Sequence, residues 1–159
     1  MSRSLLEFQD DPERIPDDVR LYRRVDWDKV GGKARAARGI PPSLNSNCFK
    51  DYSESRAVGL GYPGPCMSVG LGSVLVDHDY PPEKMLELFP DYGLAYVTAG
   101  QLRTLRRADG SACPQGIMLV PTTEEPWHGV VFDQTHRPRK DAVCKAICRV
   151  ADWAIPLVK

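Results

Sequence analysis

The stretch VRLYRRVDW, residues 19–27, alternates apolar and polar side chains along its whole length. A period of two over such a segment is typical of a β-strand with one buried face. Arg23 departs from the pattern, because it falls on the face that carries Leu21 and Val25. The sequence therefore predicts either a strand that buries an arginine or a strand that is buried through its opposite face, at Tyr22.

Four further strands are predicted downstream of this segment. They cover residues 66–71, 94–97, 117–120 and 128–132. Predicted helices lie between some of them, without a strict βαβ repeat and without a glycine-rich phosphate loop. The predicted fold class is therefore α+β, with a small mixed or antiparallel sheet and about three helices.

Proline and capping signals predict the first two helices. One begins at the Pro81–Pro82 pair, whose fixed φ suits a first helical turn, and ends before Pro90. The next begins at Thr98, which has capping-box spacing to Gln101, and is predicted to end at Asp109.

The longest helix is predicted near the C-terminus, after Pro138. Its apolar and charged positions separate at helical spacing, and Asp141 and Lys145 form a favourable i,i+4 pair. The predicted apolar stripe consists of Ala142, Val143, Ala146, Ile147, Val150 and Ala151.

The length of 159 residues fits one domain. Residues 1–18 are predicted to be a polar N-terminal lead-in, and residues 19–159 a single α+β domain. Residues 28–47 are predicted to be a linker containing a short helix at 33–38, and residues 52–65 a loop rich in glycine and proline.

Charge and cysteine usage narrow the expected partners and location. Lysine plus arginine and aspartate plus glutamate each total 21, so no basic excess favours a nucleic acid. No apolar run approaches the roughly 18 residues of a membrane span, and the N-terminus has no secretory signature. The odd, irregularly spaced set of five cysteines indicates free thiols in a cytoplasmic protein, with at least Cys144 and Cys148 buried.

His128 is the first candidate site residue. It lies at the entrance to a predicted strand, with Glu124 and Glu125 upstream and Trp127 beside it. An imidazole near carboxylates either acts as a general acid or base, or binds a ligand. The alternative is a half-buried histidine that is hydrogen-bonded to a loop carbonyl. Trp127 is expected to contact the same ligand.

A polar cluster around Phe49 is the second candidate. Lys50 and Asp51 follow this aromatic residue and Ser46 precedes it. Lys50 and Asp51 either bind an anion or orient a nucleophile, with Phe49 contributing to ligand binding. The alternative is that Asp51 caps a turn and Lys50 is solvated.

Ser68 and a set of histidines and cysteines could in principle form a nucleophilic site and a zinc site, but the sequence motifs that accompany such sites are missing. Ser68 is either a site residue or an ordinary strand hydroxyl, and no G-x-S-x-G motif surrounds it to indicate a hydrolase. His128, His136, Cys144 and Cys148 include zinc-ligand types, but no C-x-x-C pair accompanies them. No metal and no cofactor are therefore expected from these patterns.

Arg23, Lys50, Asp51 and His128 are predicted to converge on one concave surface. Each is a polar residue beside apolar, strand-like neighbours, and strand ends that meet at a sheet edge commonly form ligand pockets. A partly buried arginine also requires an anionic partner. That partner is either Asp51 or a bound ligand.

Four short motifs in this order resemble a family of small, uncharacterised bacterial proteins. The family pattern is L-x-R-R, S-x-x-F-K-D, M-S-V and P-x-H-x-x-V. The corresponding segments are LYRR at 21–24, SNCFKD at 46–51, MSV at 67–69 and PWH at 126–128. The resemblance implies a bacterial cytoplasmic protein and no particular activity.

The order of Arg23, Ser68 and Glu87 also resembles the small RES-type ADP-ribosyltransferase-like toxins. This resemblance implies that Arg23 holds a pyrophosphate and that Ser68 supports the binding strand. It also implies that Glu87 polarises a ribose hydroxyl and that NAD is bound.

Two functions are therefore expected, and the sequence leaves open whether the protein is an enzyme. The first is a binding domain for a protein partner or small ligand, within a defence or toxin-related system. Its motivation is the absence of a full catalytic motif, together with proline-rich loops suited to recognition. The second is an NAD-consuming or ADP-ribosyl-transferring enzyme.

Overall fold

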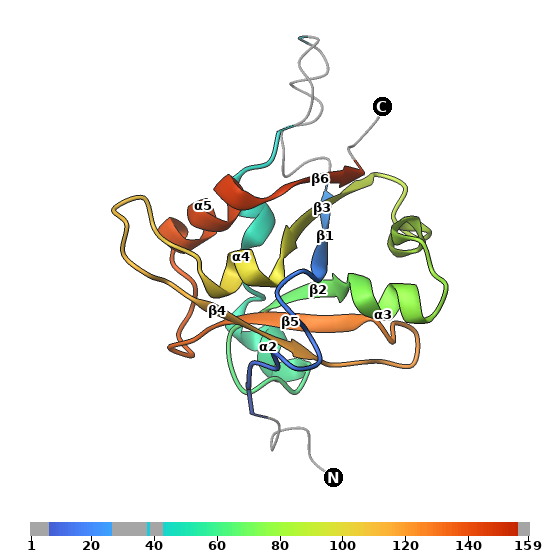
Figure 1. Ribbon diagram of the computed structural model, residues 1–159, viewed down its shortest axis with the longest axis horizontal. Coiled ribbons are helices and arrows are strands. Elements are labelled where there is room, and N and C mark those ends of the chain that lie inside the picture. Colours follow the sequence, from blue (N-terminus) through green and yellow to red (C-terminus); the bar gives the residue numbers. More distant parts are fainter. Residues whose placement is uncertain (1–6, 27–37, 39–42, 156–159) are drawn as a thin grey trace.

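A six-stranded antiparallel sheet forms the centre of the computed structural model (Figure 1), which describes residues 7–26, 38 and 43–155. Its strand order is β4-β5-β2-β1-β3-β6, and every neighbouring pair is antiparallel. This confirms the predicted α+β class. The strands are β1 (Arg20–Asp26), β2 (Met67–Leu71), β3 (Tyr92–Thr98), β4 (Gln115–Leu119), β5 (His128–Asp133) and β6 (Asp152–Ile155).

Four α-helices and two 3-10 segments accompany the sheet in the described part of the chain. The longest helix is the one predicted near the C-terminus. No helix among the described residues is long and apolar enough to cross a membrane. The segments are η3 (Ser46–Phe49), α2 (Glu54–Gly59), α3 (Gly72–Asp77), η4 (Pro82–Leu86), α4 (Ala99–Arg103) and α5 (Asp141–Val150).

The first predicted helix is wrong in type and extent. Residues 82–86 form the 3-10 segment η4, and a turn at residues 87–88 followed by Pro90 leaves no room for a longer helix. The helices α2 and α3 and the strand β6 were not predicted. The predicted helix at 33–38 lies outside the described residues, apart from Arg38.

The second predicted helix starts as expected and ends early. The Thr98 hydroxyl accepts a hydrogen bond from Gln101 N, and the Gln101 side chain accepts one from Thr98 N, so the capping box is present. The helix α4 ends at Arg103 rather than Asp109. Beyond it, Arg106 forms a β-bridge with Ala112, which directs the chain into a turn.

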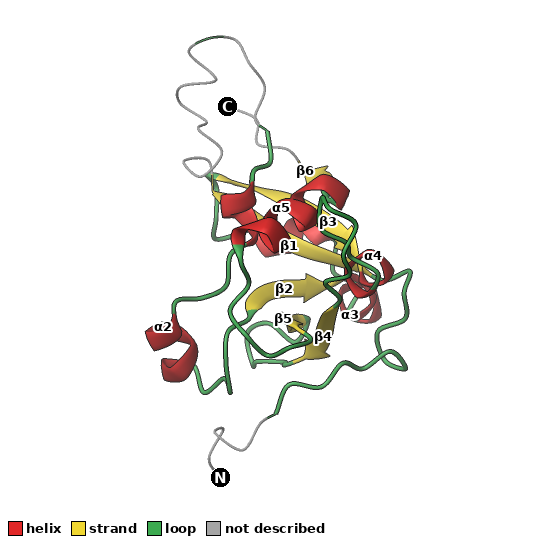
Figure 2. Ribbon diagram, turned by 90° about the vertical axis from the view of Figure 1, so that its left-hand side faces the viewer, coloured by secondary structure: helices red, strands yellow, loops and turns green. Residues whose placement is uncertain are grey.

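The central feature for function is the separation of β1 from β2. The two strands pair only at Leu21↔Leu71 and Tyr22↔Gly70, whereas β1 pairs with β3 along all seven residues. In Figure 2, β1, β3 and β6 accordingly lie in one group and β2, β4 and β5 in another. The sheet is thus split along part of its middle.

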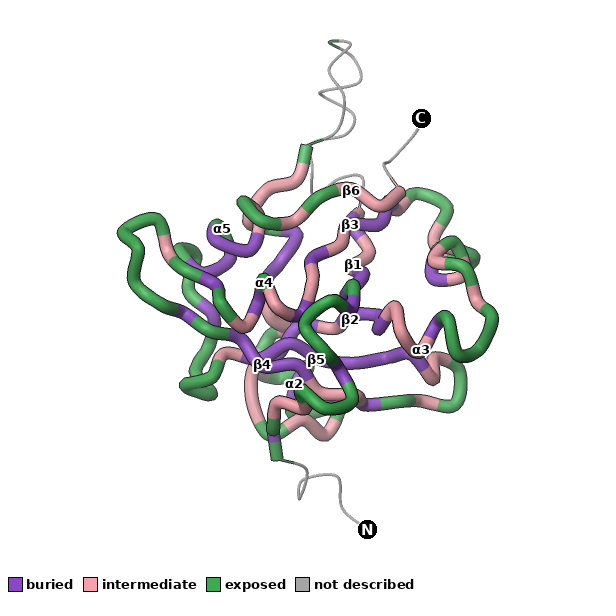
Figure 3. Tube along the Cα trace, viewed as in Figure 1, coloured by how far each residue is buried: buried purple, intermediate pink, exposed green. Residues whose placement is uncertain are grey.

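The apolar core lies mainly on one face of this split sheet. Leu21 and Val25 of β1 belong to the same core cluster as Val143 and Ile147 of α5. Buried residues are concentrated in β2 and β5 (Figure 3), so a largely buried strand, β2, borders one side of the split.

The described part of the N-terminal lead-in packs onto the domain. Phe8 stacks on Phe132 with ring centroids 4.9 Å apart, and Ile15 is buried in the main core. The Asp10 carboxylate accepts hydrogen bonds from the Arg103 side chain and from the Ile117 backbone N–H. Residues 7–18 are therefore part of the fold rather than a free polar extension.

Candidate functional site

A cleft of about 490 Å³ lies where β1 and β2 separate. Six of the eight predicted site residues line it, including the four that were expected to converge on one concave surface. The convergence is confirmed as geometry, and the roles of the residues remain predictions. The six are Arg23, Lys50, Asp51, Ser68, Trp127 and His128.

Phe49 and Glu87 do not line this cleft. Phe49 is buried in the main core, at the end of η3. Glu87 is exposed just after η4, where its carboxylate lies 3.5 Å from the Lys84 ammonium. Glu87 lines a neighbouring cavity of about 380 Å³. The carboxylates that line the cleft itself are those of Asp51 and Glu125.

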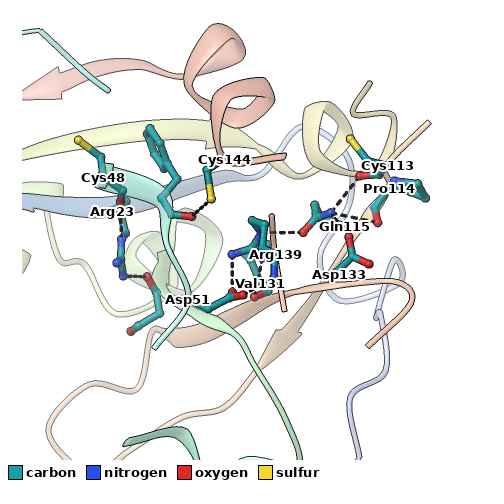
Figure 4. Close-up of polar contacts among 12 residues, drawn as sticks. Arg23, Cys48, Asp51, Cys113, Pro114, Gln115, Val131, Asp133, Arg139 and Cys144 are labelled. Carbon is teal, nitrogen blue, oxygen red and sulfur yellow. Dashed lines mark hydrogen bonds and ion pairs between the residues drawn. The ribbon is translucent and has the colours of Figure 1, made fainter. Parts of the chain in front are cut away.

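Arg23 occupies the split between the two strands. It lies on the core face of β1, as the alternation predicts, and its Nε donates to the Cys48 carbonyl at 3.1 Å (Figure 4). Its Nη1 donates to the Ser68 carbonyl at 2.8 Å. If the β1–β2 pairing continued, backbone N–H groups of β1 would bond the carbonyls of β2 at this point. The Arg23 guanidinium instead bonds the Ser68 carbonyl and so takes the place of that backbone pairing.

Arg23 and Ser68 therefore reach the cleft by different routes. The Ser68 side chain points away from the core face that Met67 and Val69 share with Arg23. A continuous sheet would keep the two side chains on opposite sides. Because the sheet is split, the long Arg23 side chain crosses between the strands and both residues line one cavity.

No carboxylate pairs with Arg23 among the described residues. The expected partner, Asp51, instead holds Arg139: Oδ1 is 2.6 Å from Nη1, and Oδ2 accepts from the Arg139 backbone N–H at 2.8 Å. Burial lowers the pKa of the Arg23 guanidinium, because desolvation disfavours its charged form. Of the two partners predicted for Arg23, Asp51 is wrong, and a bound ligand stays a prediction.

Sequence reasoning missed Arg139, whose side chain is fully buried. Beyond the Asp51 pair, it donates to Gln115 Oε1 at 3.0 Å and to the Val131 carbonyl at 3.1 Å. Nothing in the local sequence separates it from the exposed Arg137 two positions earlier, so no local signal would have found it.

Ser68 and His128 form a hydrogen-bonded pair on the cleft wall. Ser68 Oγ lies 2.8 Å from His128 Nε2, and His128 Nδ1 lies 2.8 Å from the Val120 carbonyl oxygen. A carbonyl only accepts, so Nδ1 carries a proton, and in the tautomer with a single ring proton Nε2 accepts from the Ser68 hydroxyl. The hydrogen bond to a loop carbonyl that one alternative for His128 expected is present, and a role as general acid or base stays a prediction.

Arg24 and Glu125, which were not among the predicted site residues, form a charged wall of the cleft. Their closest atoms, Nη2 and Oε2, are 2.5 Å apart, and Arg24 Nε donates to the Met85 carbonyl at 2.6 Å. The Arg24 guanidinium also lies 4.3 Å from the centre of the Phe89 ring. This wall is shared with the neighbouring cavity.

Trp127 contributes an unsatisfied donor. Its side chain is buried, and its indole Nε1 has no hydrogen-bond acceptor in the described part of the chain. An unpaired buried donor costs free energy, which a ligand oxygen would recover. The position of Trp127 on the cleft wall makes it a candidate contact for such an oxygen.

The cleft combines excess positive charge with aromatic walls. Four cationic and two anionic side chains line it, and one of those anions is already committed to Arg139, outside the lining. The cations are Arg23, Arg24, Lys50 and Arg56, and the aromatic residues are Tyr22, Tyr52, Phe89, Tyr92 and Trp127. Such a lining suits a flat, negatively charged organic ligand.

The cysteines and histidines do not form a metal-binding cluster in the described part of the chain. Among the described residues, no group of three or more His, Cys, Asp or Glu side chains is arranged to hold a metal ion. All five cysteines are free, and four are buried. Cys148 is only half-buried, so the prediction that it is buried is wrong: its position on α5 lies at the edge of the apolar stripe.

No family model, curated protein or solved structure matches the chain. The geometry of the cleft is therefore the ground on which a function is proposed.

Proposed function

We propose that the chain binds NAD, or a closely related pyrophosphate nucleotide, in the cleft and transfers its ADP-ribosyl group. This is the function that the resemblance to RES-type ADP-ribosyltransferase-like toxins implies. One observation carries the proposal: the half-buried Arg23 side chain lines the cleft and has no carboxylate partner among the described residues.

The pyrophosphate is the part of the ligand that this arginine recognises. Its two hydrogen bonds to carbonyls leave further N–H groups of the guanidinium for phosphate oxygens. Lys50, exposed at the same cleft, adds a second positive charge. Charge-assisted hydrogen bonds are stronger where the groups are partly shielded from water, as Arg23 is.

Aromatic residues of the cleft suit the rings of the same ligand. Tyr52 is half-buried, stacks on Tyr62 at 6.0 Å and lies under the Arg56 guanidinium. Trp127 presents its indole N–H without an acceptor, for a ribose or amide oxygen. The volume of about 490 Å³ falls within the usual range of small-molecule sites.

Glu125 takes the role that the resemblance had assigned to Glu87. It lines the cleft, and its partner Arg24 is itself a phosphate-binding type of side chain. A ligand phosphate that engages Arg24 weakens its hold on Glu125, whose oxygen then accepts from a ribose hydroxyl. This polarises the sugar as its bond to nicotinamide breaks.

The other expected function, a binding domain in a defence or toxin-related system, stays a prediction. So do a protein partner, a bacterial origin and a cytoplasmic location. Among the described residues, the most exposed large apolar side chains are Val58, Val76 and Leu88. They lie on three different segments and identify no partner.

Release of nicotinamide tests the proposed reaction. With water as acceptor, a C1′–O bond forms as the C1′–N bond breaks, yielding ADP-ribose, nicotinamide and a proton. We expect chromatography to detect nicotinamide from NAD with the wild-type protein, and about 100-fold less with Glu125→Gln. Glu124→Gln, an exposed neighbour outside this cleft, serves as control. No release by the wild type would overturn the proposed transfer.

A further inference from the structure

We propose that Ser68 is an activated nucleophile and that His128 is its general base, which gives the cleft a second chemistry: hydrolysis of carboxylic esters that carry a negative charge. This goes beyond ADP-ribosyl transfer and does not depend on it. No G-x-S-x-G motif surrounds Ser68, which lies within β2 rather than on a strand-to-helix turn, so this site differs from the one that the motif indicates.

The geometry of the pair meets the requirements for activating a hydroxyl. Ser68 Oγ is 2.8 Å from His128 Nε2, within hydrogen-bond reach of a base. The Val120 carbonyl, 2.8 Å from Nδ1, holds the proton on the far side of the ring. A carbonyl thus performs the orienting task that a third group has in nucleophile–base systems.

Paired strands hold both residues in place. β2 and β5 pair from Met67↔Val131 to Gly70↔His128, which sets Ser68 and His128 as diagonal neighbours on one face of the ladder. Such rigid elements position a site more precisely than loops do. The pair lines the cleft, so a ligand in the cleft lies beside it.

The reaction balances without a cofactor. Ser68 Oγ bonds the ester carbonyl carbon as its proton passes to His128 Nε2, and the alcohol then leaves with that proton. Water attacks the acyl-Ser68, gives a proton to Nε2, and the acid leaves as the proton returns to Ser68 Oγ. The guanidinium of Arg23, bonded to the Ser68 carbonyl, supplies positive charge near the oxyanion and selects anionic esters.

Labelling with diisopropyl fluorophosphate tests the nucleophile directly. Ser68 Oγ would attack phosphorus, fluoride would leave and His128 would take the proton. We expect one label per chain, mapped to Ser68 by peptide mass spectrometry. Ser68→Ala should lose the label, and His128→Ala should slow labelling by at least about 100-fold. Ser73→Ala and His78→Ala lie outside the cleft and should label at the wild-type rate.

The outcomes separate this inference from the proposed function. An unlabelled wild type, a label at another residue, or wild-type labelling of His128→Ala would each overturn it. Mapping on the wild type requires no variant, so a variant that fails to fold leaves the test intact. Nicotinamide release without a Ser68 label would refute only this inference, whereas labelling without nucleotide binding would refute only the nucleotide proposal.

Discussion

Two arginines, Arg23 and Arg139, reach into the interior of the protein with different partners. Arg139 donates to a carboxylate, an amide oxygen and a carbonyl, so its charge is compensated within the chain. Arg23 donates to two carbonyls, whose dipoles compensate a full charge only in part. At the scale of residues, this difference indicates a structural role for Arg139 and supports the proposed role of Arg23 in ligand binding.

Removing Asp51 should destabilise the protein strongly, because Arg139 would remain as a buried charge without its carboxylate. We expect Asp51→Ala to lower the free energy of unfolding by about 3–5 kcal/mol, measured by urea titration. Asp141→Ala removes an exposed i,i+4 pair with Lys145 and should leave the midpoint almost unchanged. Equal shifts for the two variants would contradict the assignment of Arg139.

At the scale of elements, the alternation in residues 19–27 correctly predicted a strand, β1, but neither alternative for its buried face holds alone, because Leu21 and Tyr22 are both buried and Arg23 is half-buried. Local periodicity does not report which strands pair, so the split between β1 and β2 was not foreseen. That split depends on contacts such as Arg23 to Ser68, which are distant along the chain.

The candidate site was predictable where polar residues interrupt apolar strands. Arg23, Ser68 and His128 have that contrast, and all three line the cleft. Phe49 and Glu87 do not line it. Phe49 was chosen for its aromatic character, which does not tell a ligand contact from a core residue, and its side chain lies in the core. Glu87 was chosen for its order along the chain, which does not show where a side chain points, and it lies just after the 3-10 segment η4. Arg24 and Glu125 were missed as a pair, since they lie far apart in the sequence and meet only in the fold.

Packing between β4 and β5 gives a prediction at the same scale. A Cβ on Gly116 would lie 2.4 Å from Cζ of the Phe132 ring, which itself stacks on Phe8. We expect Gly116→Ala to cost about 1–3 kcal/mol of unfolding free energy in urea, as overpacked cores do. A Cβ on Gly59, at the end of α2, would meet nothing within 4 Å, so Gly59→Ala is the matched control. A Gly116→Ala variant as stable as the control would refute this packing.

For the whole molecule, buried thiols predict how stability changes with pH. Burial raises the pKa of Cys66 to about 12 and also raises the pKa values of Cys113, Cys144 and Cys148. In the unfolded chain these thiols ionise near pH 8.5, so above about pH 9 the unfolded state binds fewer protons than the folded one. The free energy of unfolding should therefore fall as pH rises through this range.

Urea unfolding under reducing conditions at neutral pH and near pH 10 measures this effect. Cys66→Ala should show a smaller fall than the wild type, because it lacks the thiol with the most strongly raised pKa. Equal falls for the two proteins would show that Cys66 ionisation does not contribute to the pH dependence.

Charge is distributed unevenly over the molecule in a way that the overall composition conceals. The formal net charge is +0, yet cationic side chains outnumber anionic ones in the cleft lining. Local charge, rather than the overall balance, determines which ligand a site attracts. A formal net charge of zero for the whole chain is thus compatible with a local site that binds a pyrophosphate.

Isothermal titration calorimetry with NAD tests the central claim most directly. The wild type should bind one NAD per chain. Arg23→Met, which removes the charge but keeps an apolar stem, should weaken binding at least tenfold, as expected (about 1.5 kcal/mol or more) for loss of a hydrogen bond to a charged group. Arg137→Met, at an exposed arginine outside the cleft, should bind like the wild type. Absence of binding by the wild type, or equal affinity of a folded Arg23→Met variant, would contradict the account.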